Sequence, residues 1–140
     1  MSENPILILT VGLPRSGKST WAKEADLPMV NPDSIRLALH GKAYVQEAED
    51  LVWSIAVIMT RALIYSGHEC IIIDATNATA KRRNFWREKF PHCVISIKKF
   101  EVGMDLCRER ALEGGREDLV PVIERMAETI DFDTDSDKFK

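Results

Sequence analysis

The stretch that decides the fold is VGLPRSGKST, residues 11–20. It carries the pattern G-x-x-x-x-G-K-[ST], directly after the apolar run 6–11 and at the start of a helix predicted over 18–25. In such a loop, backbone N–H groups surround phosphates, the lysine reaches the β- and γ-phosphates, and the hydroxyl is a ligand for Mg²⁺. The expected nucleotide contacts come from Gly12, Pro14, Arg15, Ser16, Gly17, Lys18, Ser19 and Thr20.

Strands and helices alternate along the rest of the chain. Short β-branched apolar runs predict strands, and helical apolar periodicity with Gly or Pro at the ends predicts helices. The expected strands are 6–11, 29–30, 70–75 and 93–100, and the expected helices are 18–25, 34–40 with Asp33 or Ser34 as its cap, 46–66, 79–90, 103–113 and 121–130. We therefore expect a single α/β domain over residues 1–130, with a mostly parallel central sheet of about four strands flanked by helices.

Length and composition limit the class of protein. A chain of 140 residues fits one domain, and its formal charge of −3 argues neither for nor against a polyanionic partner. The three cysteines form no C-x-x-C pair, and no apolar run approaches the roughly 20 residues of a membrane helix. We expect a cytoplasmic protein with no membrane partner, and an acidic, disordered tail over residues 131–140.

The strand 70–75 contains Asp74 where it runs out, at the carboxyl edge of the predicted sheet. Ligands of α/β sheets bind at this edge, and an acid here orients Mg²⁺ in P-loop proteins, so Ser19 and Asp74 are the predicted metal residues. An Asx turn or a helix cap is the alternative role for Asp74. Thr76 and Asn77 follow it, and for them an acceptor contact and a helix cap are both open.

The segment NPDSIR, residues 31–36, bears on the type of reaction. A kinase that acts on a hydroxyl uses a carboxylate to accept the hydroxyl proton, a role that Asp33 can fill. Arg36 lies three residues later on the same helical face and can hold an anionic acceptor group. The alternative is an N-capping Asp33 with a surface arginine.

Two further segments are rich in arginine. Residues 107–121 contain Arg108, Arg110 and Arg116 around a Gly-Gly pair, which is typical of a mobile lid that closes over phosphates, or of a plain helix–helix loop. Residues 81–89, KRRNFWREK, combine five basic side chains with Phe85 and Trp86. Such a combination suits single-stranded nucleic acid, although we favour a solvated helix with Phe85 or Trp86 in the core.

Taken together, GLPRSGKSTWA, NPDSIR, IIIDATN with RRNFW, and R…GGREDLVP resemble the 5′-kinase domain of phage and animal polynucleotide kinases, from about residue 6 to residue 126. The resemblance implies a P-loop kinase with an Arg-bearing lid. It assigns the general base to Asp33, the grip on the acceptor's phosphate to Arg36, and the phosphate and metal contacts to Lys18, Ser19 and Asp74. Arg116 is the first choice for the lid arginine and Arg110 the second.

Three hypotheses follow for function. The first is an ATP- and Mg²⁺-dependent kinase that phosphorylates the 5′-hydroxyl of DNA or RNA, with Asp33, Lys18, Arg36 and Arg116 as its catalytic residues. The second keeps this chemistry but takes a small-molecule hydroxyl, such as that of a nucleoside, sugar or antibiotic. The third is a non-enzymatic nucleotide switch, against which the Asp33 and Arg36 pair argues.

Overall fold

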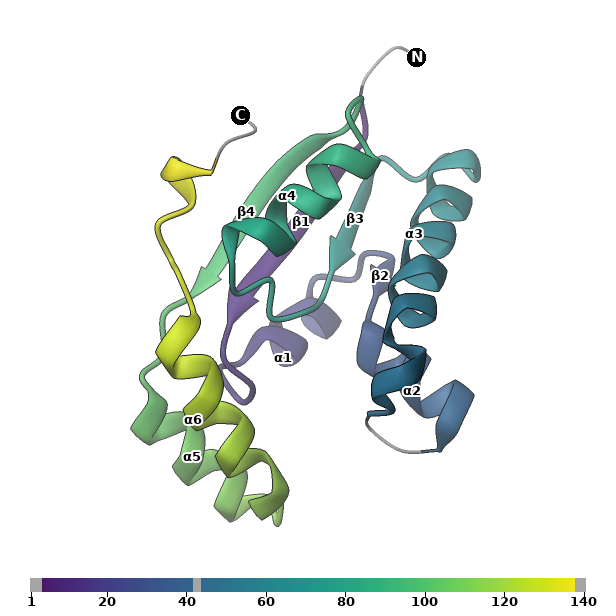
Figure 1. Cartoon of the computed structure of the whole chain (residues 1–140). Helices are drawn as coiled ribbons and strands as arrows, with labels where there is room; N and C mark the ends of the chain where they lie inside the picture. Colours follow the sequence, from purple (N-terminus) through teal and green to yellow (C-terminus); the bar gives the residue numbers. More distant parts are fainter. Residues whose placement is uncertain (1–3, 42–43, 138–140) are drawn as a thin grey trace.

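A computed structural model describes residues 4–41 and 44–137, and its centre is a parallel sheet (Figure 1). The strands are β1 (Ile6–Gly12), β2 (Met29–Val30), β3 (Cys70–Ile73) and β4 (Val94–Phe100). They lie in the order β2-β3-β1-β4, and each neighbouring pair is parallel. The predicted α/β class with a parallel four-stranded sheet is confirmed.

The helices also follow the predicted pattern. They are α1 (Lys18–Glu24), α2 (Pro32–His40), α3 (Glu49–Tyr65), α4 (Ala80–Lys89), α5 (Met104–Glu113) and α6 (Val120–Thr129), with 3-10 turns at Gln46–Ala48, Glu117–Leu119 and Thr134–Ser136. Within the described ranges, no helix has the length and hydropathy needed to cross a membrane.

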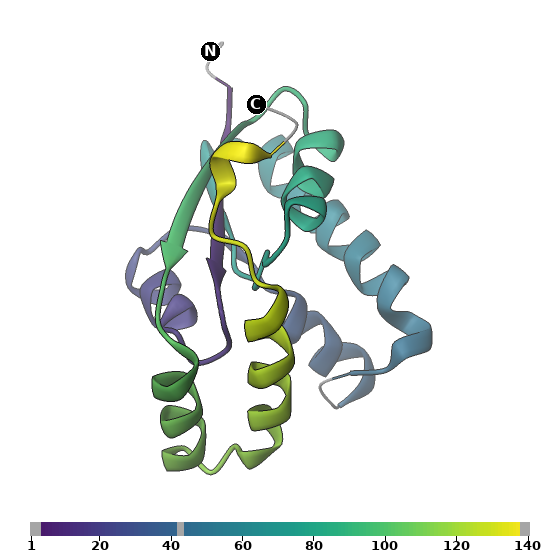
Figure 2. The same cartoon turned by 60° about the vertical axis from the view of Figure 1, so that its left-hand side comes forward.

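The helices form layers on the two faces of the sheet. One core packs α3 and α4 against the face that carries Leu7, Leu9, Ile71 and Ile73, with Trp86 fully buried among them. Figure 2 shows α1 on the opposite side of the sheet from these two helices. The chain therefore leaves β1 toward one face and the neighbouring β3 toward the other, and the ends of these two strands form the crevice in which α/β sheets bind ligands.

A hairpin of α5 and α6 lies beyond the carboxyl ends of the strands (Figures 1 and 2). Its own small core contains Cys107, Ala111 and Ile123 together with Leu13 from the loop after β1. Because Leu13 joins this core, the hairpin is packed directly against the phosphate-binding segment.

The start of α2 differs from the prediction. The side chain of Asn31 caps this helix, and its Oδ1 accepts hydrogen bonds from the backbone N–H of Asp33 at 2.8 Å and of Ser34 at 3.2 Å. The expectation that Asp33 or Ser34 is the cap is therefore wrong, because Asn31 one residue before Pro32 already satisfies these donors. The Asp33 carboxylate is thus left available for other contacts.

The C-terminal segment packs against the domain up to residue 137. Asp131 N–H donates to the Ala78 carbonyl at 2.8 Å. The Asp137 carboxylate accepts bonds from Arg83 Nε at 2.9 Å and Nη2 at 3.0 Å, and from Arg87 Nη1 at 2.8 Å. This differs from the solvated tail expected over 131–140, because a fully buried arginine requires a carboxylate partner. Residues 138–140 of that expected tail lie outside the described residues.

Candidate active site

The loop between β1 and α1 depends on its two glycines. A Cβ atom at Gly12 would lie 2.6 Å from Ser16 Oγ and 3.0 Å from Phe100 Cβ, so no larger residue fits without a shift. Gly17 has a φ of 103°, a conformation that other residues rarely adopt. These glycines allow the chain to fold back on itself between β1 and α1.

Lys18 lies inside this loop and is almost fully buried. Its Nζ donates a hydrogen bond to the Leu13 carbonyl at 2.7 Å. Burial lowers the pKa of Lys18 to about 8, although the nearby Asp74 carboxylate, and to a smaller extent Cys107 and Asp33, favour the charged form. A buried ammonium whose charge the nearby carboxylates only partly neutralise is suited to bind a phosphate.

Other features of the loop fit a phosphate as well. The Ser16 Oγ is buried and has no hydrogen-bond partner among the described residues. The N-terminus of α1 has no side-chain cap and no acidic residue in its first turn. Uncapped N–H groups, an unpartnered hydroxyl and a buried lysine together match the donor set that phosphate oxygens require.

Asp74 lies on the other side of this crevice and is 3 % exposed. Its Oδ2 accepts hydrogen bonds from Ser19 Oγ at 3.0 Å and from Asn31 Nδ2 at 3.0 Å. The structure thus brings together the two predicted metal residues. Mg²⁺ takes few ligands from the protein and keeps waters and phosphate oxygens for the rest, so a hydroxyl beside a carboxylate is a donor set that fits it.

Asp33 and Arg36 lie on α2 near this crevice. Arg36 Nη1 contacts Asp33 Oδ1 at 2.6 Å, while its Nε and Nη2 hold the two oxygens of Glu49 at 2.9 and 2.8 Å. The Glu49 hydrogen bonds are the main cause of the raised pKa of Arg36. The side chains of Arg36 and Glu49 are each 15 % exposed, whereas that of Asp33 is 79 % exposed. The pair therefore presents an exposed carboxylate next to a firmly held guanidinium.

The sequence analysis did not identify Glu49 or Asn31 as site residues. Glu49 begins α3, and 12 residues separate it from Arg36, so the two residues do not share a face of one helix. Asn31 has two roles, since its Oδ1 caps α2 and its Nδ2 donates a hydrogen bond to Asp74. The signal available for Asn31 was its place directly before a proline at a helix start.

The candidate lid arginines lie in and after α5. Arg110 Nη1 donates to the Arg15 carbonyl at 3.1 Å, and the Arg15 guanidinium lies close to Gly114. Arg116 pairs with Asp118 at 3.0 and 3.1 Å, and these hydrogen bonds raise the pKa of Arg116, with a smaller contribution from the Asp33 carboxylate. Asp33 thus acts electrostatically on both Lys18 and Arg116.

A cleft of about 570 Å³ opens on the outer side of the loop. Arg15, Thr20, Trp21 and Arg110 line it together with residues of α1 and α5. The predicted contacts Arg15, Thr20 and Arg110 therefore converge here, whereas Pro14 is half-buried and does not line this cleft. Arg108 contacts Asp105 and, at 2.9 Å, Glu124, so within the described residues it links α5 to α6.

Asn77 serves the architecture of the site. It is fully buried, its Nδ2 donates to the Thr10 carbonyl at 2.8 Å, and its Oδ1 accepts from Trp86 Nε1 at 3.2 Å. Thr79, two residues later, caps α4 by accepting from Arg82 N–H at 3.2 Å. Of the two roles open for Asn77, neither is observed, because the side chain ties β1 to α4.

Comparison with solved structures shows the same fold in kinases and in a repair complex. Chains of two structures of a Pnkp1/Rnl/Hen1 complex superpose with a TM-score of 0.71, at 26% and 20% identity over 79% and 94% of this chain; the second is described as an RNA repair complex. A gluconokinase from Sinorhizobium meliloti 1021 superposes with a TM-score of 0.62 at 16% identity, over 92% of this chain and 77% of its own.

This chain spans 40% and 48% of the two chains from the complex, which is less than half of each. Residues 7–129 match the sequence profile of the family described as AAA domain, and this match covers most of the chain. The loop geometry, the parallel sheet and the profile agree. The chain therefore belongs to the AAA domain family and has the fold of its P-loop kinases.

Proposed function

We propose that this chain is an ATP- and Mg²⁺-dependent kinase that phosphorylates the 5′-hydroxyl of a DNA or RNA strand. The observation that carries this proposal is the arrangement of Asp33 and Arg36. Glu49 holds two donors of the Arg36 guanidinium, and Asp33 lies against a third while remaining 79 % exposed. A nucleic-acid end offers a hydroxyl and a phosphodiester one sugar apart, which matches a carboxylate beside a guanidinium.

The proposed chemistry uses these two groups together. Asp33 accepts the proton of the 5′-hydroxyl as its oxygen forms a bond to the γ-phosphorus, and the bond from that phosphorus to the bridging oxygen breaks to release ADP. Nη1 and Nη2 of Arg36 each keep a second N–H, which can donate to the phosphate on the 3′ side of the acceptor nucleotide. The guanidinium thereby positions the hydroxyl.

The donor nucleotide occupies the loop in this proposal. Lys18 and the loop N–H groups hold the β- and γ-phosphates, and the cleft beside Thr20 and Arg110 takes the nucleoside. Ser19 and Asp74 would hold Mg²⁺, which offsets phosphate charge when bound. Arg116 would leave the exposed Asp118 and turn toward the phosphates, whose charge it would offset.

A second candidate acceptor is a small-molecule hydroxyl. The formal charge of −3 favours it, because a polyanionic acceptor is not attracted by the chain as a whole. The likeness to a gluconokinase concerns the fold alone at 16% identity. We place it second because the Arg36 guanidinium, held by Glu49, keeps N–H donors that can bind an anionic acceptor.

The test is transfer of label from γ-labelled ATP to 5′-hydroxyl DNA and RNA oligonucleotides and to 3′-phosphorylated nucleosides, with a metabolite panel in parallel. We expect 5′ label on the nucleic acids, and a loss of about 10³-fold or more with Asp33→Asn. Asp26→Asn, at an exposed acid after α1, is the matched control and should behave as the wild type. Label only on a metabolite, or full activity with Asp33→Asn, would contradict the proposal.

A further inference from the structure

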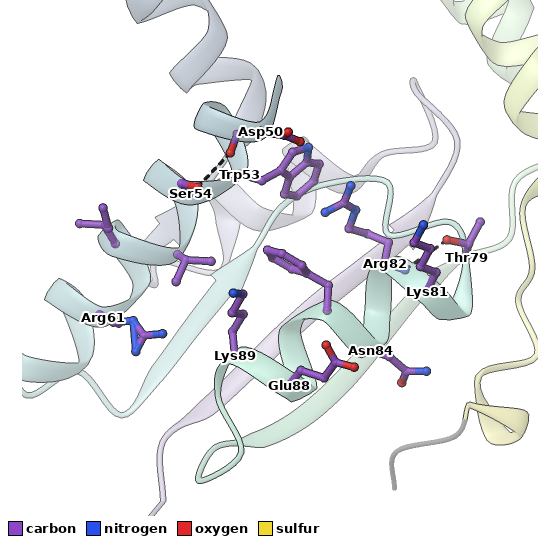
Figure 3. A pocket seen from close by; sticks show the side chains of 13 residues that line it. Asp50, Trp53, Ser54, Arg61, Thr79, Lys81, Arg82, Asn84, Glu88 and Lys89 are labelled. Carbon is purple, nitrogen blue, oxygen red and sulfur yellow. Dashed lines mark hydrogen bonds between the residues drawn. The ribbon is translucent and has the colours of Figure 1, made fainter. Parts of the chain in front are cut away.

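A second cavity, of about 1030 Å³, runs between α3 and α4. Figure 3 shows Trp53 and Arg61 on one side of this α3–α4 groove and Arg82 and Lys89 on the other. None of the roles assigned above uses these four side chains. The groove is therefore a surface that the proposed transfer reaction leaves unexplained.

The groove is more basic than the chain that carries it. Its lining contains the cations Arg61, Lys81, Arg82 and Lys89 and the anions Asp50 and Glu88, within a chain of formal charge −3. Arg61, Lys81 and Lys89 are exposed. Cations gathered in a concave surface attract phosphates more strongly than the net charge of the protein indicates.

Two half-buried aromatic rings lie among these cations. Trp53 and Phe85 meet edge to face with centroids 6.1 Å apart. The Arg82 guanidinium lies 3.6 Å from the Trp53 ring and 5.1 Å from the Phe85 ring, and Lys89 Nζ lies 5.8 Å from Phe85. Alternating planar and cationic groups are the arrangement on which nucleobases stack while their phosphates are neutralised.

One ring of the groove lies close to the candidate active site. The Arg36 guanidinium lies 5.9 Å from the centre of the Trp53 ring, and Trp53 lines the groove. Burial is the main cause of the lowered pKa of Arg82; the Glu49 carboxylate acts to raise this pKa and the Arg36 guanidinium to lower it. The charges of Arg82, Glu49 and Arg36 therefore lie close together. From Trp53 to Arg61 the helix rises by about 12 Å, which three stacked nucleotides can occupy at about 3.4 Å each.

We infer that the α3–α4 groove binds the single-stranded segment that follows the acceptor nucleotide, with bases against Phe85 and against the Arg82 guanidinium stacked on Trp53, and with phosphates near Arg61 and Lys89. This inference rests on the proposed function, since the strand enters the groove from the phosphate held by Arg36. It predicts that acceptors of several nucleotides are used better than a 3′-phosphorylated nucleoside.

The experiment compares KM for a 5′-hydroxyl 12-mer with KM for a 3′-phosphorylated nucleoside in three proteins. These are the wild type, Arg61→Gln/Lys89→Gln, and Phe85→Leu, which keeps an apolar side chain but removes the ring. We expect the wild type to favour the 12-mer by roughly tenfold and each variant to lose most of this preference. The salt dependence of 12-mer binding, measured by fluorescence anisotropy, should fall by about 1.4 in log–log slope for the double variant.

Lys23→Gln/Arg125→Gln is the control, because it removes two exposed positive charges from α1 and α6, outside the groove. It should keep the wild-type preference and salt slope. Equal KM for both acceptors in the wild type, or equal effects of both double variants, would overturn the inference while leaving the proposed transfer intact. Tight, groove-dependent binding of the 12-mer without any label transfer would instead overturn the proposed function.

Discussion

The pairing of Asp137 with Arg83 leads to a test of the whole C-terminal segment. Both side chains are fully buried, and Asp137 holds Arg83 through two hydrogen bonds and Arg87 through a third. Asp137→Ala leaves Arg83 as a buried cation. Its remaining contacts are the carbonyls of Asn77 at 3.1 Å and Asp131 at 2.9 Å, and the Asp131 carboxylate at 3.7 Å.

The expected loss in the free energy of unfolding is about 3 kcal/mol. Removing one partner of a buried ion pair costs about 3–5 kcal/mol, and the nearby Asp131 carboxylate places this case at the lower end. For a domain of this length, 1 kcal/mol corresponds to roughly 3–4 °C in Tm, so Tm should fall by about 10 °C. Arg83→Met/Asp137→Ala, which removes both charges, should recover a large part of this loss.

Thermal unfolding followed by circular dichroism, together with urea unfolding, measures these changes. Hydrogen bonds from Arg83 and Arg87 outweigh the effect of burial, which alone would raise the pKa of Asp137, and hold that pKa below its usual value. The stabilisation is therefore present above about pH 4 and is lost as pH falls through the lowered pKa. A loss equal to that of the exposed control Glu128→Ala, or one independent of pH down to acid conditions, would refute the reasoning.

Two further predictions concern the site. Glu49→Gln should raise the KM for the acceptor by roughly tenfold and leave the KM for ATP unchanged, because it weakens the hold on Arg36 and makes no contact with the nucleotide loop. Steady-state kinetics measures both constants, and a parallel rise in the two KM values would contradict this prediction. Lys18→Met should abolish transfer yet raise the Tm of the nucleotide-free protein, because it removes a buried cation with a pKa of about 8. For the same reason, the free energy of unfolding of the wild type should rise with pH between about 8 and 10.5, where the unfolded lysine still binds a proton and the folded one does not. A free energy of unfolding that stays constant over this pH range would contradict the prediction.

The sequence was sufficient for most of the fold and for the nucleotide loop. Strands such as β1 and β3 are short runs of mostly apolar residues that are largely buried, and the spacing of Gly12, Gly17 and Lys18 is typical of a phosphate-binding loop. Asp74 was expected at the metal site because a strand end places it at the ligand edge of the sheet. These features depend on neighbours along the chain, so a local pattern was enough to predict them.

The features that were missed depend on contacts between distant segments. Glu49 reaches Arg36 only after α2 has turned back along α3, and Asp137 meets Arg83 from 54 positions away. In the sequence, Asp137 belongs to an acidic run and Arg83 to a basic run, and both read as solvated. Two charged segments that neutralise each other inside the protein carry no periodic signal.

The same C-terminal packing determines how the protein can be tethered. The start of β1 and the turn at Thr134–Ser136 both lie at the end of the molecule opposite the α5–α6 hairpin (Figure 2). A biotin or a fusion partner attached beyond either of these points would therefore lie far from the crevice between β1 and β3. Immobilised on a sensor surface through such a handle, the protein would present the nucleotide loop to ligands in solution.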